Sequence, residues 1–218
     1  MDVIFGNLDL WGEAIGNTLL VFFIGGIIAL VLGIIVGAMR VSPVPIARSV
    51  GTVYVNLVRN TPLTLVFFFF VFGYPQLGLP NLSNTVLGIL AIGVYTATYV
   101  AEVLRAGINT VPVGQAEAAR AIGLPFGQVM TSVILPQAFR SVVPPMMSVF
   151  IALLKNTTVA AGFSIAELAA LRSTINDAPD RPGNPMEVLL WVAVVFVALV
   201  MVMSGLQRYL ENRWRIAR

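Results

Sequence analysis

The chain has 218 residues, of which 58% are hydrophobic and 11% are charged, whereas about 25% of the residues in an ordinary soluble domain are charged. With a mean hydropathy of +0.90, it has more apolar surface than a soluble domain of this size can bury, so most of it is expected to lie in a lipid bilayer. The absence of Cys and His excludes disulfides, thiolate nucleophiles, histidine triads, His-ligated haem and zinc fingers, and the thinly spread net charge of +3 does not indicate a nucleic-acid partner.

Three membrane spans are predicted in the first half of the chain. A spanning helix needs about 20 mostly apolar residues, and the first such run covers 14–39. The next charge-free stretch is about twice as long as one span and contains a turn-rich break at 73–81, which indicates two helices. We expect these spans at 53–72 and 85–104, with Arg59 reaching back from the second to the nearer membrane surface.

The second half is predicted to hold two more spans. A polar stretch at 109–136 precedes a short apolar run, where a fourth span is expected at 138–155 if flanking residues contribute to it. The mixed region 156–185 indicates short helices and a loop, and a fifth span is expected at 188–206. The predicted fold is therefore an all-α integral membrane protein that forms one domain over residues 1–218.

The distribution of basic residues predicts the orientation in the membrane, because an odd number of spans places the termini on opposite sides. The side that holds the C-terminal tail also holds these residues: Arg40, Arg48, Arg59, Arg105, Arg120 and Arg140. By the positive-inside rule that side is cytoplasmic. The N-terminus is then outside, and the polar stretch 109–136 lies in the cytoplasm.

Small residues recur on one face of the first span, at Gly26, Ala29, Gly33 and Gly37. Such spacing allows two helices to approach closely. The face is expected to pack within the helix bundle, and a dedicated dimer contact is the alternative.

Several polar side chains in or beside the spans are candidates for a solute pathway: Asn17, Glu102, Lys155, Asn156, Thr157 and Thr158. Glu102 can pair with Arg105 three residues later, or it can act as a gate or contact the solute. Lys155 and the polar residues after it can hold a carboxylate, or Lys155 can extend to the membrane surface while its neighbours end a helix. Asn17 can line a pore or be satisfied between helices.

The polar stretch 109–136 contains the most specific pattern. A break at 111–114 is expected to precede a short helix that begins near Gln115, with Glu117 in its first turn, where a carboxylate is stabilised by the helix dipole. Gly123 and Pro125 are expected to end this helix, and a second one is expected to run to about residue 134. A short exposed helix with an alanine-rich surface suits docking into a groove of another protein. The alternative is an ordinary amphipathic connector.

The spacing resembles the EAA loop in the membrane subunits of ATP-binding-cassette (ABC) importers: Glu-Ala-Ala, three residues, Gly, nine residues, Ile, one residue and Leu-Pro. The matching residues are Glu117, Ala118, Ala119, Gly123, Leu135 and Pro136, with Val133 in the position of Ile. Three further segments, 59–63, 99–108 and 154–158, are similar to the permeases of polar-amino-acid importers. Among these, the sequence is most similar to glutamate-type permeases of actinobacteria.

The resemblance implies a type I ABC importer permease of the bacterial cytoplasmic membrane, which moves a polar amino acid by alternating access. It implies these partners: two ABC ATPase subunits, a second permease copy or a related permease, an extracytoplasmic amino-acid-binding protein and the lipid bilayer. It implies no cofactor, metal or nucleic acid, and it implies contact with the ATPase by these residues: Glu117, Ala118, Ala119, Arg120, Gly123, Leu135 and Pro136.

The chain itself is not expected to be an enzyme. It lacks the Gly-x4-Gly-Lys-Ser/Thr loop, so another chain must bind any ATP. The alternative function is an ion-gradient-driven carrier or a channel, which would require paired intramembrane acids or repeated broken helices. An intramembrane enzyme is a further alternative, but the sequence offers no matching nucleophile and base.

Overall fold

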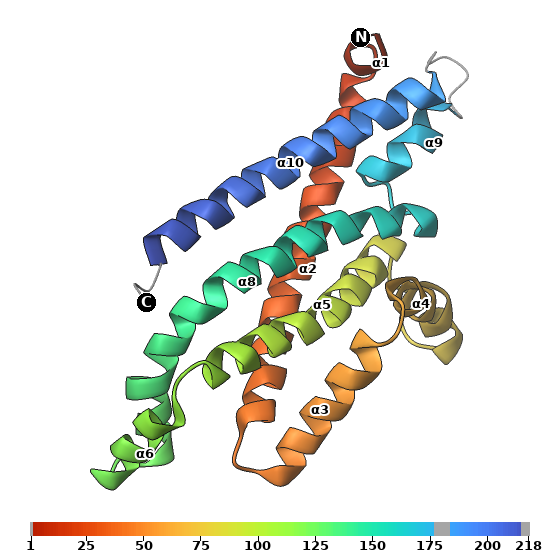
Figure 1. Cartoon of the computed structure of the whole chain (residues 1–218). Helices are drawn as coiled ribbons and strands as arrows, with labels where there is room; N and C mark the ends of the chain where they lie inside the picture. Colours follow the sequence, from red (N-terminus) through yellow and green to blue (C-terminus); the bar gives the residue numbers. More distant parts are fainter. Residues whose placement is uncertain (1, 177–183, 215–218) are drawn as a thin grey trace.

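The computed structural model describes residues 2–176 and 184–214, and this part of the chain is helical throughout its regular elements (Figure 1). The α-helices are α1 (Asp2–Phe5), α2 (Leu8–Val41), α3 (Pro45–Arg59), α4 (Leu63–Phe68), α5 (Asn84–Asn109), α6 (Val113–Ala121), α7 (Phe126–Gln128), α8 (Leu135–Asn156), α9 (Leu171–Asn176) and α10 (Pro185–Trp214). Two π turns, Phe69–Gly73 and Val129–Ile134, and three 3-10 turns, Tyr74–Leu77, Thr157–Phe163 and Leu168–Ala170, extend or connect them.

Four continuous helices of the described residues are long and apolar enough to cross a membrane, namely Leu8–Val41, Asn84–Asn109, Phe126–Phe163 and Pro185–Arg213. A fifth candidate is a broken pair of helices, Pro45–Arg59 and Leu63–Leu77, which are bent by 102° relative to each other. The expected all-α membrane fold is therefore confirmed, with four or five spans according to how the broken pair is counted.

The break within this pair differs from the expectation of one continuous helix at 53–72. Pro62 has no N–H to donate and disfavours the helical conformation in the residue before it, so α3 ends at Arg59 and the chain turns. The Thr61 hydroxyl donates to the Leu57 carbonyl at 2.8 Å, which satisfies a carbonyl at the end of α3. Arg59 thus lies at the end of a helix, next to the break in the pair, and not inside a continuous helix.

The helix that contains α8 also differs from expectation, because it shows no restart at Pro136. Helical structure is continuous from Phe126 to Phe163, so the expected fourth span, 138–155, is only its central part. A π turn at Val129–Ile134 directly precedes Pro136, and its wider winding accommodates the ring and the missing N–H of a proline inside a helix.

Helices α2 and α5 form the closest pair in the bundle, and the stripe of small residues on α2 is the reason. A Cβ atom on Gly33 would lie 2.4 Å from Val100 Cγ1, and one on Gly37 would lie 3.2 Å from Leu104 Cδ1. The interpretation of this stripe as packing within the bundle is confirmed, since Gly26, Ala29, Gly33 and Gly37 are all buried.

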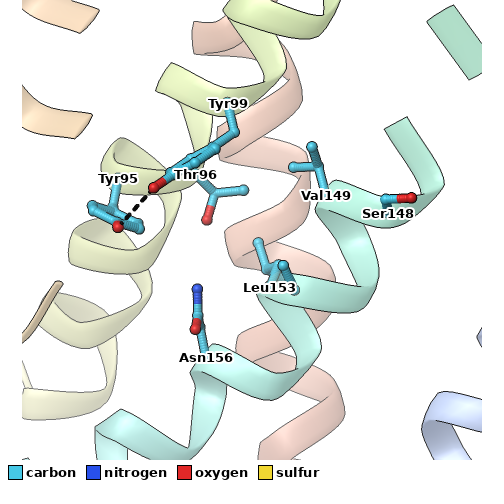
Figure 2. Close-up of a pocket in the computed structure, with 8 residues that line it drawn as sticks. Tyr95, Thr96, Tyr99, Ser148, Val149, Leu153 and Asn156 are labelled. Carbon is cyan, nitrogen blue, oxygen red and sulfur yellow. Dashed lines mark hydrogen bonds between the residues drawn. The ribbon is translucent and has the colours of Figure 1, made fainter. Parts of the chain in front are cut away.

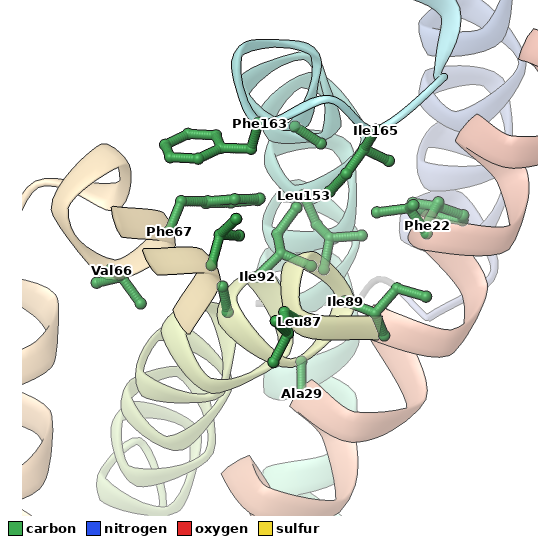
Figure 3. Close-up of a cluster of buried hydrophobic side chains, with 14 of the residues drawn as sticks. Phe22, Ala29, Val66, Phe67, Leu87, Ile89, Ile92, Leu153, Phe163 and Ile165 are labelled. Carbon is green, nitrogen blue, oxygen red and sulfur yellow. The ribbon is translucent and has the colours of Figure 1, made fainter. Parts of the chain in front are cut away.

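A cluster of buried apolar side chains joins α2, α4, α5 and α8 to the 157–165 segment (Figure 3). Phe67 of α4 is fully buried and stacks on Phe163, with ring centroids 5.0 Å apart. Ile165 packs so closely on α5 that a Cβ on Gly88 would lie 2.3 Å from its Cδ1 atom. The cluster fixes α5 and α8 relative to each other, and the candidate site lies between these two helices.

Candidate functional site

A cavity of about 420 Å³ lies between α5 and α8, within the usual size range of small-molecule sites. Its lining residues are Tyr95, Thr96, Tyr99, Ser148, Val149, Ala152, Leu153 and Asn156. Along each helix, successive lining residues are adjacent or three residues apart, so each helix contributes one face. Two faces that are about 50 residues apart in sequence thus meet around one space.

The cavity wall is largely apolar but carries several neutral polar groups, and none of its described lining residues is charged. Figure 2 shows Tyr95 and Tyr99 on α5 facing Leu153 and Asn156 on α8, with the Asn156 amide directed into the space between the helices. The hydroxyl groups of the two tyrosines are hydrogen-bonded to each other at 2.9 Å. Phenol, hydroxyl and amide groups can both donate and accept hydrogen bonds, so this wall suits a small polar molecule.

Arg59 adds a positive charge at the edge of this cavity. Its guanidinium carbon lies 5.2 Å from the centroid of the Tyr99 ring, which is a cation–π distance. Arg59 is the last residue of α3, directly before the 102° bend between α3 and the following helix. The sequence predicted instead that Arg59 reaches the membrane surface from inside a continuous span, and the structure does not support that expectation.

The helix α6 lies at the end of the molecule farthest from the N-terminus (Figure 1). It packs against the π turn before α8, and Ala119 is buried while Glu117, Ala118 and Arg120 are exposed. Ile122, which follows the helix, is 78% exposed. The α6 connection, the segment 109–136 that joins α5 to α8, therefore presents an apolar side chain and charged groups together on its surface.

The boundaries of α6 agree with expectation at one end and differ at the other. Gly123 has a φ of +88°, and the Leu124 N–H donates to the Ala119 carbonyl at 3.1 Å, so the predicted glycine termination is confirmed. The helix begins at Val113, two residues before the expected Gln115, because Pro112 already precedes a helical turn. The prediction that Glu117 lies in the first turn is therefore wrong.

Comparison with known proteins identifies the family. The family described as "Binding-protein-dependent transport system inner membrane component" matches residues 29–216. The chain belongs to this family. This permease is therefore a multi-pass, non-catalytic subunit of an ABC importer in the bacterial cytoplasmic membrane, and a partner ATPase hydrolyses the ATP. An ion-gradient-driven carrier, the alternative that the sequence left open, belongs to a different class of transporter.

Several relatives and solved structures are similar along most of the permease. The "Glutamate transport system permease protein GluC" of Corynebacterium efficiens is 44% identical over 198 residues, which cover 84% of this chain and 85% of that protein. The "Probable glutamine ABC transporter permease protein GlnM" of Bacillus subtilis is 35% identical, with coverage of 98% and 97%. A structure described as "Crystal structure of an amino acid ABC transporter with histidines" has a TM-score of 0.89, 27% identity and coverage of 96% of both chains. An inward-facing MetNI methionine transporter shares the fold, with a TM-score of 0.77 at 20% identity and coverage of 96% and 98%.

The structure separates the residues that the sequence grouped around Lys155. Asn156 lines the cavity, but Lys155 is exposed and lies with Thr158 in a different groove, against α10. The hydroxyl of Thr157 donates to the Leu154 carbonyl, and that of Thr158 donates to the Lys155 carbonyl, both at 2.8 Å. These hydroxyls stabilise the end of α8, so only Asn156 of the four lies at the candidate site.

The other two candidates connect separate elements. Asn17 donates from its amide to the Ala166 carbonyl at 2.7 Å, which fastens the 164–170 segment to α2. Glu102 pairs with Arg105, as its spacing indicated, and also with Arg40 of α2, a partner that sequence reasoning missed. Each carboxylate oxygen accepts from one guanidinium, so Glu102 bridges the ends of α2 and α5.

Glu167 is a buried acid in the mixed region 156–185, where the sequence predicted short helices and a loop. Its side chain has no solvent exposure, and its Oε1 atom accepts from the backbone N–H groups of Ala169 and Ala170 at 2.8 and 3.2 Å. The neighbouring Leu168 N–H donates to the Thr18 hydroxyl at 2.9 Å. Burial raises the pKa of the Glu167 carboxyl to about 7. This cluster lies away from the cavity and holds the segment before α9 against α2.

Proposed function

We propose that the permease imports an acidic amino acid, with glutamate as the first candidate, through the cavity between α5 and α8. The observation that supports this most directly is the set of neutral polar groups in a largely apolar cavity wall, with the Arg59 guanidinium at its edge. A cationic cargo would need a carboxylate partner there, and none of the described lining residues supplies one. The 44% identity to a glutamate permease points to the same class of cargo.

The cavity provides a partner for each group of an amino acid. The hydroxyls of Tyr95 and Tyr99 and the Asn156 amide can accept from an ammonium group or donate to a carboxylate. Arg59 can then bind a second carboxylate, because a guanidinium offers two parallel donors to it. A neutral polar amino acid such as glutamine would form the first set of contacts and lack the second.

We expect α6 to couple ATP hydrolysis by the ATPase to transport. In the proposed assembly, two ABC ATPase subunits bind the α6 connections of this permease and of a second copy or related permease, and an extracytoplasmic binding protein delivers the cargo. The contact is proposed for Glu117, Ala118, Ala119, Arg120 and Gly123, with Leu135 and Pro136 at the base of α8. The N-terminus is then outside and α6 is cytoplasmic, as the positive-inside rule favours.

Alternating access follows if ATP binding changes the distance between the two α6 docking points. The helix packs on the π turn that leads into α8, and α8 forms one wall of the cavity. A displacement of α6 can therefore be transmitted to that wall through the continuous helix Phe126–Phe163. The required differential contact is the one between α6 and the two states of the ATPase.

The cargo assignment is tested by uptake competition in cells that lack or express this permease. Radiolabelled glutamate uptake should be abolished without it, and unlabelled glutamate and aspartate should compete better than glutamine, arginine or histidine. Competition by arginine or histidine at least equal to that by glutamate would refute the acidic cargo.

Arg59 provides the matched test within the site. Arg59→Gln removes one charge-assisted interaction, so the KM for glutamate should rise about tenfold, while Arg59→Lys should retain part of the affinity. Arg172→Gln, an exposed arginine outside the cavity, is the control and should leave the KM unchanged. An unchanged KM in Arg59→Gln would show that this guanidinium does not contact the cargo.

A further inference from the structure

A second pocket, of about 550 Å³, opens where α2 ends, α3 begins and α5 ends. Its lining residues are Arg40, Pro45, Arg48, Ser49, Thr52, Val53 and Arg105. None of them lines the cavity between α5 and α8, and none belongs to the α6 connection. The connection between α2 and α3, which forms one rim of this pocket, lies at the end of the molecule away from the N-terminus (Figure 1).

The charges around this pocket are unbalanced. Three guanidinium groups face it, and among the described residues the carboxylate that contacts them is Glu102, whose two oxygens are each bound by one arginine. The Arg40 side chain is only 10% exposed, and the Nε atoms of Arg40 and Arg105 are buried without an acceptor. Buried donors without acceptors are costly, so the pocket has excess positive charge and too few acceptors.

The donors on α3 are held in place before any ligand arrives. The Nη1 atom of Arg48 donates to the carbonyls of Ser42 and Pro43 at 2.9 and 3.0 Å, which fixes the guanidinium at the rim. Ser49 and Thr52 lie on the same face of α3, one turn apart, so their hydroxyls line the same space. A preorganised set of guanidinium and hydroxyl donors matches the oxygens of a phosphate group.

An apolar surface adjoins the pocket, and it favours a ligand with a hydrocarbon chain over a free anion. Ile46, Val50, Val53 and Leu57 are 76%, 53%, 64% and 69% exposed. Their spacing of four, three and four residues places them in one stripe along α3, and Val53 belongs both to this stripe and to the pocket lining. A ligand with a phosphate in the pocket would therefore have an apolar surface beside it for a hydrocarbon chain.

We propose that this pocket binds the phosphate headgroup of an anionic phospholipid of the cytoplasmic leaflet, with an acyl chain along the α3 stripe. The assignment to the cytoplasmic leaflet rests on the proposed function, in which this end of the permease is cytoplasmic. Basic pockets between membrane helices on this side favour anionic headgroups. The bound lipid supplies the acceptors that Glu102 cannot, and it joins α3 to the ion-paired ends of α2 and α5.

Native mass spectrometry of the full chain tests this, with phosphatidylglycerol and phosphatidylcholine of identical acyl chains added in equal amounts. The wild type should retain phosphatidylglycerol in preference to phosphatidylcholine. Arg48→Gln should lower that preference about fivefold, the usual effect of one basic residue at an anionic surface. Arg208→Gln, an exposed arginine on α10 outside the pocket, should leave it unchanged. Equal retention of both lipids by the wild type, or an unchanged preference in Arg48→Gln, would overturn the proposal.

Further measurements identify the ligand and show whether lipid binding is independent of the choice of cargo. Excess inorganic phosphate should not displace the lipid, and Val50→Ser should weaken retention, because the acyl chain contributes to binding. Displacement by phosphate, together with full retention in Val50→Ser, would assign the pocket to a soluble phosphate instead. Arg48→Gln should leave the order of competing amino acids in uptake unchanged, so a failure of lipid binding and a failure of the cargo assignment give different results.

Discussion

Replacing Gly33 with alanine should separate the two most closely packed helices of the permease. The added Cβ would lie 2.4 Å from Cγ1 and 2.5 Å from Cβ of Val100, and 3.0 Å from the carbonyl oxygen of Ala97. Comfortable carbon–carbon contacts are about 3.5–4.0 Å, so α2 and α5 must move apart by about 1 Å. The backbone oxygen cannot change rotamer, and the β-branched Val100 has few rotamers available in a helix.

The magnitude follows from two opposing effects. Overpacking a filled contact costs about 1–3 kcal/mol, whereas alanine is favoured over glycine inside a helix by about 1 kcal/mol. Gly16 lies on the same helix with no atom within 4 Å of its added Cβ, so Gly16→Ala should show only the gain. The two variants should therefore differ in free energy of unfolding by about 1–3 kcal/mol.

Reversible denaturant unfolding in detergent measures this difference, and a double-mutant cycle assigns its cause. Val100→Ala removes Cγ1, the nearest contacting atom, but keeps the Cβ atom of residue 100, so in combination with Gly33→Ala it should recover part of the cost, at least about 0.5 kcal/mol relative to additivity. Equal stability of Gly33→Ala and Gly16→Ala, or strictly additive effects of Gly33→Ala and Val100→Ala, would refute the packing of α2 on α5 described above.

Three further predictions concern the two ends of the molecule. Gly123→Ala places a side chain at a φ of +88°, which costs about 1–2 kcal/mol, so it should reduce co-purification of the ATPase. Gly127→Ala, where the added Cβ meets open space, is the control. Equal recovery of the ATPase with both variants would contradict the docking role. Glu117→Lys should reduce uptake while ATP hydrolysis continues, and normal uptake would exclude this carboxylate from coupling. Because the folded-state pKa of Glu167 is raised from 4.5 to about 7, the folded state retains a proton that the unfolded state releases, and stability should fall as pH rises from about 4.5 to about 7. Glu167→Gln should lose this pH slope in thermal unfolding and the control Glu13→Gln should keep it; the same slope in both variants would contradict the burial of Glu167.

The spans were predictable from sequence because long apolar runs have few alternatives in a membrane protein. The break in the second span was missed although Arg59, Asn60 and Thr61 interrupt the apolar run before Pro62, because hydropathy over a whole span does not register a missing N–H. Pro136 posed the opposite problem. It looked like a helix boundary, but the π turn before it depends on tertiary packing that no local pattern reveals.

The candidate site was only partly predictable for a similar reason. Asn156 was identified from its polar neighbours, but whether it or Lys155 faces the cavity depends on how α8 is rotated against α5. Tyr95 and Tyr99 are four residues apart, a spacing that indicates a shared helix face, yet only the pairing of α5 with α8 makes that face a cavity wall. The contact between Arg40 and Glu102 spans 62 residues of sequence and has no local signal.

The most direct test of the transport proposal is amino-acid uptake by proteoliposomes that contain the permease, its ATPase and an external binding protein. Glutamate should accumulate only when ATP is present on the side of the ATPase, and Asn156→Leu, which replaces the amide in the cavity wall, should reduce accumulation while the complex remains assembled. Accumulation that persists without ATP and collapses with the proton gradient would contradict the account.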